Sequence, residues 1–245
     1  MPEKLPDNLN HHQLQRRLAK GVLITIEGSD GSGKGTQYNI IRKKLEDSTY
    51  AVSFEDFPQY DDPSSYLASE YLNGKYGDAD ELGAYAPSVL FAVDRFDASA
   101  KRINPDLANG KLVLTNRFVG SNMAHQGQKI HDDTAREKYY DWLFDFEFNI
   151  LKNPRPDLNI VLHVPADIAQ QNVDKKEVRS YTDKKRDIHE ADINHLTRSV
   201  AAYRQLCEQF PQQFTLIECT DNGEMLPVET VTEIIWSKIQ PLLAA

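Results

Sequence analysis

A glycine-rich stretch with one lysine, EGSDGSGKGTQ, runs from Glu27 to Gln37 and has the residue types that bind phosphate. Its glycines allow a tight turn in which successive backbone amides point inward at phosphate oxygens. Lys34 adds a mobile positive charge that can follow a phosphoryl group during transfer. The stretch fits G-x-x-x-x-G-K-[ST] except at the last position, where Gly35 replaces the hydroxyl residue that usually contacts magnesium. We therefore predict a nucleoside triphosphate site whose ligands are Gly28, Ser29, Asp30, Gly31, Ser32, Gly33, Lys34, Gly35 and Thr36.

Two arginines and two phenylalanines further along the chain could hold the molecule that receives a phosphoryl group. The guanidinium of Arg95 or Arg117 can grip a phosphate or a base carbonyl with two parallel hydrogen bonds. Phe91 precedes Arg95 by one helical turn, so both side chains would project from one helix face. A ring could then stack on a base whose edge the arginine contacts, and Phe57 is a second aromatic candidate. Core packing and ordinary ion pairs are the competing interpretations of these residues.

The hydrophobic pattern predicts the elements that position these residues. Short apolar runs indicate buried parallel strands, and helical patterns separate them. This alternation predicts an α/β fold, a doubly wound five-stranded parallel sheet flanked by helices, with ligands at the carboxyl ends of the strands. The predicted strands are Gly21–Gly28, Lys111–Phe118, Leu158–Val164, the weaker Phe214–Thr220 and the more polar Tyr50–Phe57. The predicted helices are Thr36–Glu46, Ser64–Asn73, Ala86–Lys101, Asp133–Leu151, Ala191–Glu208 and Val228–Leu243.

Two segments lie outside this pattern. Residues 1–20 are polar and read as an N-terminal extension, and residues 21–245 then form one domain, because no repeat or Gly/Ser-rich linker divides them. The second segment, VDKKEVRSYTDKKRDIHEAD, spans Val173–Asp192 and is densely charged. On composition alone it could be a solvated surface or a cationic cover for a phosphate site.

Bulk composition limits the partners. The 245 residues include 28 Lys and Arg against 37 Asp and Glu, a net charge of −9, which argues against nucleic acid as a partner. The apolar runs are too short to span a membrane, and the start MPEKLPDNLNHH lacks the apolar core of a signal peptide. Cys207 and Cys219 give no disulfide framework, so we expect buried thiols in a reducing cytoplasm.

Several motifs in order carry a family resemblance. GSGKGTQ is similar to the loop of adenylate kinases and uridylate–cytidylate kinases, in which Gly-Thr follows the lysine. From Gly21 to Leu243 the chain resembles thymidylate kinases, a family of phosphate-loop nucleoside monophosphate kinases. The matching motifs are EGSDGSGKGTQ, FP at Phe57–Pro58, LFAVDRFDA at Leu90–Ala98, LTNRFVGSNMAHQG at Leu114–Gly127 and PDLNIVLHVPADIA.

The resemblance implies in-line transfer of the γ-phosphoryl group of ATP to dTMP, giving dTDP and ADP without a side-chain nucleophile. It implies that Arg95 faces thymine O4, that Arg117 binds the acceptor phosphate, and that Asp30 bonds the sugar 3′-hydroxyl. Phe57 would lie near the phosphate and sugar, while Ser121 and Gln126 would address the base edge. The residues expected to take part in catalysis are Lys34, Arg117, Arg186 and Asp30.

The resemblance also implies Mg²⁺ held mainly by ATP phosphates and water, with no side-chain metal site, and a homodimer. Kinases of this type carry a lid, and Val173–Asp192 occupies its position. Because Gly31 and Ser32 stand where some relatives have a loop arginine, the lid is expected to supply the positive charge. Its candidate cations are Arg186 first, then Arg179 and Lys185.

Three departures from the family keep alternatives open. Asn116 replaces the acid of D-R-[YF], Asp187–Glu190 lacks an arginine and an aromatic, and Lys129–Asn153 is longer than usual. One alternative is a deoxynucleoside kinase with Glu55 or Asp56 as its general base. A second is a nucleotide-binding switch, against which the absence of a loop hydroxyl argues. A third is a relative with weak or no activity, which the missing acid allows.

Overall fold

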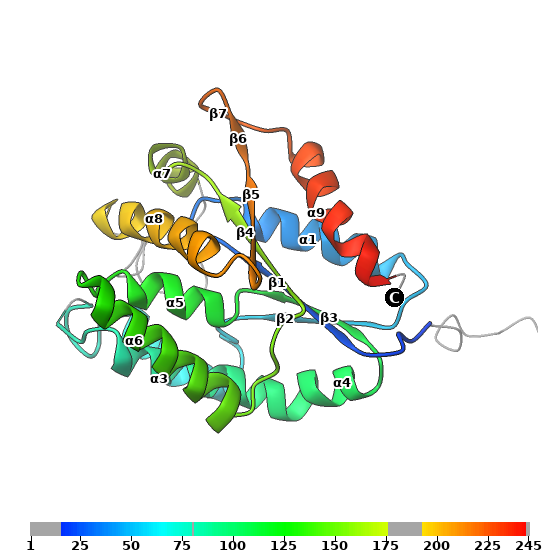
Figure 1. Cartoon of the computed structure of the whole chain (residues 1–245), viewed down its shortest axis with the longest axis horizontal. Coiled ribbons are helices and arrows are strands. Elements are labelled where there is room, and N and C mark those ends of the chain that lie inside the picture. Colours follow the sequence, from blue (N-terminus) through cyan, green and yellow to red (C-terminus); the bar gives the residue numbers. More distant parts are fainter. Residues whose placement is uncertain (1–15, 80, 176–192, 244–245) are drawn as a thin grey trace, which may run out of the picture.

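The computed structural model of the chain describes residues 16–79, 81–175 and 193–243. Its largest sheet has five parallel strands in the order β2-β3-β1-β4-β5 (Figure 1). This arrangement confirms the predicted doubly wound α/β fold. The strands are β1 (Val22–Glu27), β2 (Val52–Asp56), β3 (Leu112–Asn116), β4 (Leu158–His163) and β5 (Phe214–Glu218).

Helices cover both faces of the sheet (Figure 1). On one face lie α1 (Lys34–Glu46) and α9 (Val228–Leu243). On the other lie α3 (Tyr85–Ala98), α5 (Val119–Gly127), α6 (Asp133–Phe144) and α8 (Ile193–Gln209). The shorter elements are η2 (Pro63–Ser65), α2 (Tyr66–Leu72), α4 (Asn104–Ala108), α7 (Ala166–Asp174) and a hairpin of β6 (Thr220–Asp221) and β7 (Glu224–Met225).

Two hydrophobic clusters hold these layers together, because side chains of a strand alternate between its faces. Ile24 and Ile26 of β1 point into the α1–α9 cluster, while Leu23 between them points into the other. All three are fully buried. The central strand is therefore buried on both faces and mostly apolar, which explains why it stands out in the sequence.

Parallel pairing brings the carboxyl ends of three strands to one edge. Ile26 of β1 is the partner of Asn116 in β3, and Asn116 is also the partner of Asp56 in β2. The chain leaves β1, β2 and β3 at this edge, so the segments that follow these strands are neighbours in space. The phosphate-binding motif, the Phe57–Pro58 pair and Arg117 are thus gathered at one end of the sheet.

Some elements differ from the predicted ones. The helices α5 and α7 were not predicted, and α7 includes Val173 and Asp174, the first residues of the expected lid. Helix α3 continues through a π-helical segment, η3 (Ser99–Ile103), into α4, and α6 continues through another, η4 (Asp145–Ile150). The remainder of the expected lid lies outside the described residues.

Candidate active site

The segment between β1 and α1 turns sharply over the end of the sheet. Gly28, Gly31 and Gly33 have φ values of 148°, 78° and 83°, which side chains other than glycine rarely adopt. A Cβ on Gly31 would lie 2.0 Å from the carbonyl oxygen of Ala169, so this glycine also permits close packing against α7. Since Gly33 is followed directly by α1, the turn ends at a helix N-terminus, which favours anions.

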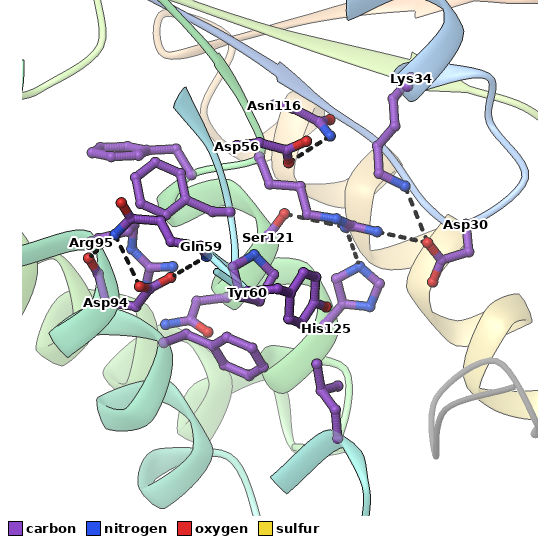
Figure 2. A pocket seen from close by; sticks show the side chains of 18 of the residues that line it. Asp30, Lys34, Asp56, Gln59, Tyr60, Asp94, Arg95, Asn116, Ser121 and His125 are labelled. Atoms are coloured by element: carbon purple, nitrogen blue, oxygen red, sulfur yellow. Dashed lines mark hydrogen bonds and ion pairs between the residues drawn. The ribbon is translucent and has the colours of Figure 1, made fainter. Parts of the chain in front are cut away.

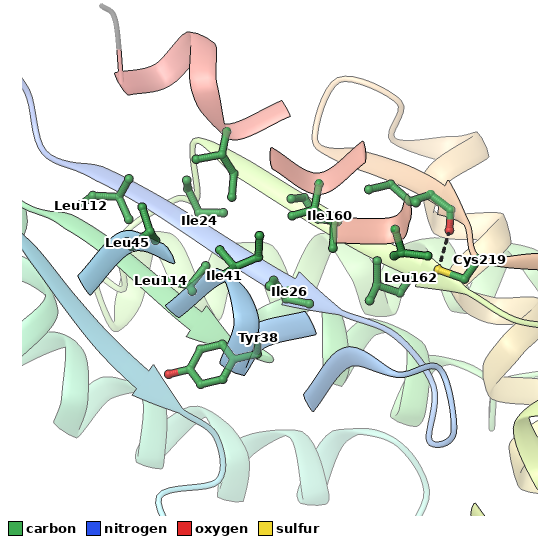
Figure 3. Close-up of a cluster of buried hydrophobic side chains, with 14 of the residues drawn as sticks. Ile24, Ile26, Tyr38, Ile41, Leu45, Leu112, Leu114, Ile160, Leu162 and Cys219 are labelled. Carbon is green, nitrogen blue, oxygen red and sulfur yellow. Dashed lines mark hydrogen bonds between the residues drawn. The ribbon is translucent and has the colours of Figure 1, made fainter. Parts of the chain in front are cut away.

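Helix α1 is held rigidly behind this turn by the sheet (Figure 3). Tyr38, Ile41 and Leu45 form its buried apolar stripe and pack in the same cluster as Ile24 and Ile26 of β1. The Tyr38 hydroxyl also donates a hydrogen bond to the carbonyl oxygen of Glu55, 3.0 Å away. The core therefore fixes the first turn of α1, which carries the lysine.

Lys34 and Arg117 converge on one carboxylate. The Lys34 Nζ lies 3.1 Å from Asp30 Oδ1 and 3.1 Å from the Ser29 carbonyl oxygen, and Figure 2 shows the contact with Asp30. The Arg117 Nη2 donates to the same Asp30 oxygen at 2.6 Å. Two cations from different segments are thus separated by a single carboxylate. Such a geometry can hold two phosphate groups close to each other.

Arg117 is positioned by its backbone and by polar neighbours. Its φ of 67° is unusual for a non-glycine residue. Its Nη1 lies 3.1 Å from His125 Nε2 and 3.4 Å from Ser121 Oγ. Burial and the Arg117 charge hold the pKa of His125 well below its usual range, so the neutral ring accepts this hydrogen bond. Ser121 in turn donates to Glu27 Oε2 at 2.6 Å.

Two aromatic side chains line the part of the cleft beyond Arg117. Phe57 is buried and meets Phe118 edge to face, with ring centroids 5.7 Å apart. Phe91 meets Tyr71 in the same manner at 5.9 Å. Both rings line the same cleft as Arg117. Together they form an apolar slot suited to a flat ring.

Arg95 reaches the cleft from α3, one turn after Phe91, and is paired with a buried acid. Its Nε lies 3.0 Å from Glu147 Oε1, and its Nη2 also contacts that oxygen. The side chains of Arg95 and Glu147 are 3% and 0% exposed, so the pair is shielded from water. Asn153 Nδ2 donates to the other Glu147 oxygen at 2.7 Å. The guanidinium is therefore held in one orientation.

Helix α5 contributes polar groups to the cleft wall. Gln126 is 1% exposed, and its Oε1 has no hydrogen-bond partner among the described residues. Asn122 is also buried, and its Nδ2 donates to the Ser88 carbonyl oxygen at 3.0 Å. A buried acceptor without a donor is costly, so a ligand with an N–H group would satisfy Gln126.

Many of these groups surround one cleft of about 760 Å³. From the predicted site it brings together Asp30, Gly31, Gly33, Lys34, Gly35, Thr36, Phe57, Phe91, Arg95, Arg117, Ser121 and Gln126. Gly28, Ser29 and Ser32 belong to the turn but do not line the cleft wall, and Arg179, Lys185 and Arg186 lie outside the described residues. Lining residues that the motifs did not single out as substrate ligands include Asp56, Gln59, Tyr60, Asp94, Arg102, Asn122 and His125.

Several of those additional residues form a supporting network. Asp94 accepts hydrogen bonds from the Gln59 backbone N–H at 2.9 Å and from Ser64 Oγ at 2.6 Å. Arg102 donates to Glu55 Oε1 at 2.7 Å and also contacts Gln59. These contacts fix the segment that follows Phe57–Pro58. Asp94 stands directly before Arg95 within the LFAVDRFDA motif, which is the one sequence signal that could have drawn attention to it.

Known proteins resemble the chain over most of its length. A family model described as "Thymidylate kinase" matches residues 26–226. A thymidylate kinase of Mycobacterium tuberculosis is 32% identical over 190 residues, covering 77% of this chain and 86% of that protein. A probable thymidylate kinase of Thermococcus kodakarensis is 30% identical over 227 residues, covering 91% of this chain and 98% of that protein. The solved structure of a Candida albicans thymidylate kinase has the same fold, with a TM-score of 0.68 at 23% identity, covering 91% and 92% of the two chains.

Proposed function

The chain belongs to the thymidylate kinase family and phosphorylates dTMP, and we propose that it does so in the cleft that holds Lys34 and Arg117. The observation that carries this proposal is the meeting of these two cations at Asp30, at 3.1 Å and 2.6 Å. Phosphoryl transfer needs a donor and an acceptor phosphate held in line, with positive charge around both. Two cations from separate segments of the chain meet this need.

The donor side is the turn from Gly28 to Thr36. Its left-handed glycines, the N-terminus of α1 and the Lys34 ammonium support binding of the ATP phosphates. Lys34 then follows the γ-phosphoryl group as the bond to the ADP oxygen breaks. The new bond forms from an oxygen of the acceptor phosphate, so no side chain has to act as nucleophile.

The acceptor side is the apolar slot with its polar rim. We assign the thymine ring to the slot between Phe57 and Phe91, its O4 to Arg95, and its N3–H to the unsatisfied oxygen of Gln126. Arg117 binds the phosphate of dTMP, which brings that dianion beside the donor. Ser121 supports Arg117 and acts on the base only indirectly, because its hydroxyl is bonded to Glu27.

A lid from Val173 to Asp192 is proposed to close over both nucleotides within a single domain of residues 21–245. Arg186, Arg179 and Lys185 would then add positive charge at the transferring group and exclude water from it. This proposal rests on composition and position in the chain, since residues 176–192 lie outside the described ranges.

Thymidylate kinases generally use ATP with Mg²⁺, and we propose that this chain uses the same metal. Bound together with ATP, the metal would neutralise negative charge that develops on the phosphates during transfer. Within the described residues no group of three His, Cys, Asp or Glu could hold a metal ion by itself. The cleft does carry the carboxylates of Asp30 and Asp56, and oxygen donors combined with phosphates suit Mg²⁺.

The test is release of ADP measured across a panel of nucleosides and nucleoside monophosphates. We expect turnover with dTMP to exceed turnover with dCMP, purine monophosphates and thymidine. A preference for thymidine would instead support a deoxynucleoside kinase, although Glu55, one candidate base for that reaction, is bonded to Arg102. Binding of nucleotides without turnover on any member of the panel would contradict the kinase assignment.

The enzyme is also proposed to form a homodimer through α3. Val93 and Phe96 lie three residues apart on this helix and are 43% and 44% exposed. Tyr66 and Leu67 of α2, which packs on α3, are 62% and 44% exposed. An apolar face of this kind, built from two adjacent helices, is suited to a second copy of the chain.

We expect Phe96→Arg to convert the dimer to a monomer, because the charge would be buried in the interface without a partner. Sedimentation velocity over a range of protein concentrations measures the change. Met225→Arg, which alters a 38% exposed apolar residue in the distant hairpin, is the matched control. A monomeric wild-type protein, or equal dissociation of both variants, would refute this interface.

A cytoplasmic location is the final part of the proposal. Cys207 and Cys219 are buried free thiols, as expected for packing residues, and burial raises the pKa of each to about 12, which disfavours the reactive thiolate. Among the described helices none is long and apolar enough to cross a membrane.

A further inference from the structure

Two oxygen-bearing side chains meet where β2 and β3 end. Asp56 and Asn116 are partners in the parallel register, and Asn116 Nδ2 donates to Asp56 Oδ1 at 2.9 Å. Both residues line the cleft, and Figure 2 shows their hydrogen bond in the same cleft as Lys34. Asn116 stands where the family motif has an acid, so the structure supplies a carboxylate at this point from the neighbouring strand.

The hydrogen bond leaves one atom of this pair unsatisfied. Because the Asn116 amide nitrogen donates to Asp56, the Oδ1 of the same amide group points away from Asp56. That oxygen is buried and has no hydrogen-bond partner in the described part of the chain. A buried acceptor that receives no hydrogen bond is unfavourable, so such an atom indicates a ligand or an ordered water. A hard cation, or a water molecule bound to it, would satisfy this oxygen.

The charges around Asp56 suit a metal–phosphate ligand. Asp56 lies near two positive charges, those of Arg117 and Lys34, and it accepts the Asn116 hydrogen bond. A carboxylate at the edge of a phosphate site would repel the phosphates unless a cation lay between them. Asp56 therefore favours a nucleotide that arrives with its divalent metal over one that arrives alone.

We propose that Asp56 and Asn116 form an oxygen pair that receives the hydrated Mg²⁺ of the bound ATP, a proposal that rests on the function proposed above. Asp56 provides the negative charge, and Asn116 both orients Asp56 and offers its Oδ1. One carboxylate combined with phosphate oxygens and water is a usual environment for Mg²⁺. The acid missing from position 116 is thus replaced by an acid one strand away.

The test measures how strongly Mg²⁺ enhances binding of the non-hydrolysable analogue β,γ-methylene-ATP. Calorimetric titrations with Mg²⁺ and with EDTA give two affinities, and their ratio is the metal enhancement. We expect Asp56→Asn to reduce this ratio about tenfold, a loss typical of altered groups around a metal. Affinity in EDTA should be unchanged or slightly higher, because a negative charge near the phosphates has been removed. Asp61→Asn, an exposed acid of the same cleft, is the matched control.

A charge-exchange variant separates this role from a structural one. In the double variant Asp56→Asn/Asn116→Asp the carboxylate moves from the end of β2 to the end of β3. We expect most of the metal enhancement to return.

Several outcomes overturn the proposal. The proposal is wrong if the metal enhancement is unchanged in Asp56→Asn, or if Asp61→Asn loses as much of it. It is also wrong if the enhancement does not return in the double variant Asp56→Asn/Asn116→Asp. If Asp56 were a general base for a nucleoside hydroxyl, its replacement would lower turnover without changing the enhancement. Failure of the wild-type protein to bind the analogue in either buffer would instead reject the donor site. The titration contains no dTMP, so its result does not depend on whether dTMP is the preferred acceptor.

Discussion

Replacing Lys34 with alanine is expected to lower kcat for dTMP phosphorylation by about 10²–10³-fold while leaving the fold intact. The Lys34 ammonium lies 3.1 Å from Asp30 and from the Ser29 carbonyl oxygen, at the start of α1. Its charge can follow the γ-phosphoryl group, so its contribution is larger in the transition state than in the bound substrates. The affinity for ATP should therefore fall much less than kcat.

The fold should survive this change because Asp30 keeps its bond to Arg117. Thermal unfolding checks that point, and single-turnover kinetics with saturating ATP and dTMP measure the chemical step. Lys43→Ala provides the control, since Lys43 lies on the same helix with its side chain 76% exposed. Turnover of Lys34→Ala at the wild-type rate would remove the turn from the mechanism.

Replacing Arg95 with alanine is expected to destabilise the protein by about 3–5 kcal/mol, because it leaves Glu147 charged and buried without its partner. Glu147 is 0% exposed, so water cannot take over the lost hydrogen bonds. For a chain of this size such a loss would lower the unfolding midpoint by roughly 6–20 °C. Differential scanning calorimetry of the two proteins measures it.

A simple alanine variant would therefore confuse loss of thymine recognition with loss of stability. The double variant Arg95→Met/Glu147→Gln removes the charge of both residues and keeps an acceptor for Asn153 Nδ2. We expect it to regain most of the stability, while KM for dTMP rises and KM for ATP stays near the wild-type value. A stable Arg95→Ala protein would contradict the buried pair, and an equal rise in both KM values would contradict the base-reading role.

The strands and the phosphate-binding turn could be predicted because their signals are local. Leu23, Ile24 and Ile26 lie in a central strand buried on both faces, which leaves an apolar run in the sequence that only Thr25 interrupts. Strand β2 gave a weaker signal because it lies at the edge of the sheet and is only partly buried. The glycines of the turn follow from the backbone geometry that phosphate binding requires.

Helix α5 could not be predicted because it is buried on nearly all sides. Its polar residues Asn122, His125 and Gln126 are buried too, so no amphipathic pattern remains. Glycine is also a poor helix former, yet close packing requires it here. A Cβ on Gly127 would lie 2.7 Å from the Tyr140 ring, and one on Gly120 would lie 2.9 Å from Glu27 Oε1.

The partners of the site residues could not be predicted, since they are set by register and by helix irregularities. Arg95 and Glu147 are 52 residues apart, and Glu147 lies in the π-helical segment η4. Asp56 and Asn116 are 60 residues apart and meet only through the parallel register of β2 and β3. The sequence motif shows only that Asn116 replaces an acid. The pairing of β2 with β3 shows that Asp56 provides a carboxylate beside it.

Gly35 lies in the first turn of α1 with no atom within 4 Å of the position that a Cβ would take. Its backbone is helical rather than left-handed, so neither strain nor crowding inside the protein demands a glycine. Glycine at a helix position costs roughly 0.8–1.0 kcal/mol relative to alanine, and the protein bears this cost without a gain in internal packing. The space beside Gly35 is thus available to a ligand that binds the backbone amides of the turn. The residue at this position can therefore differ with the chemistry of the ligand without any change in the rest of the fold.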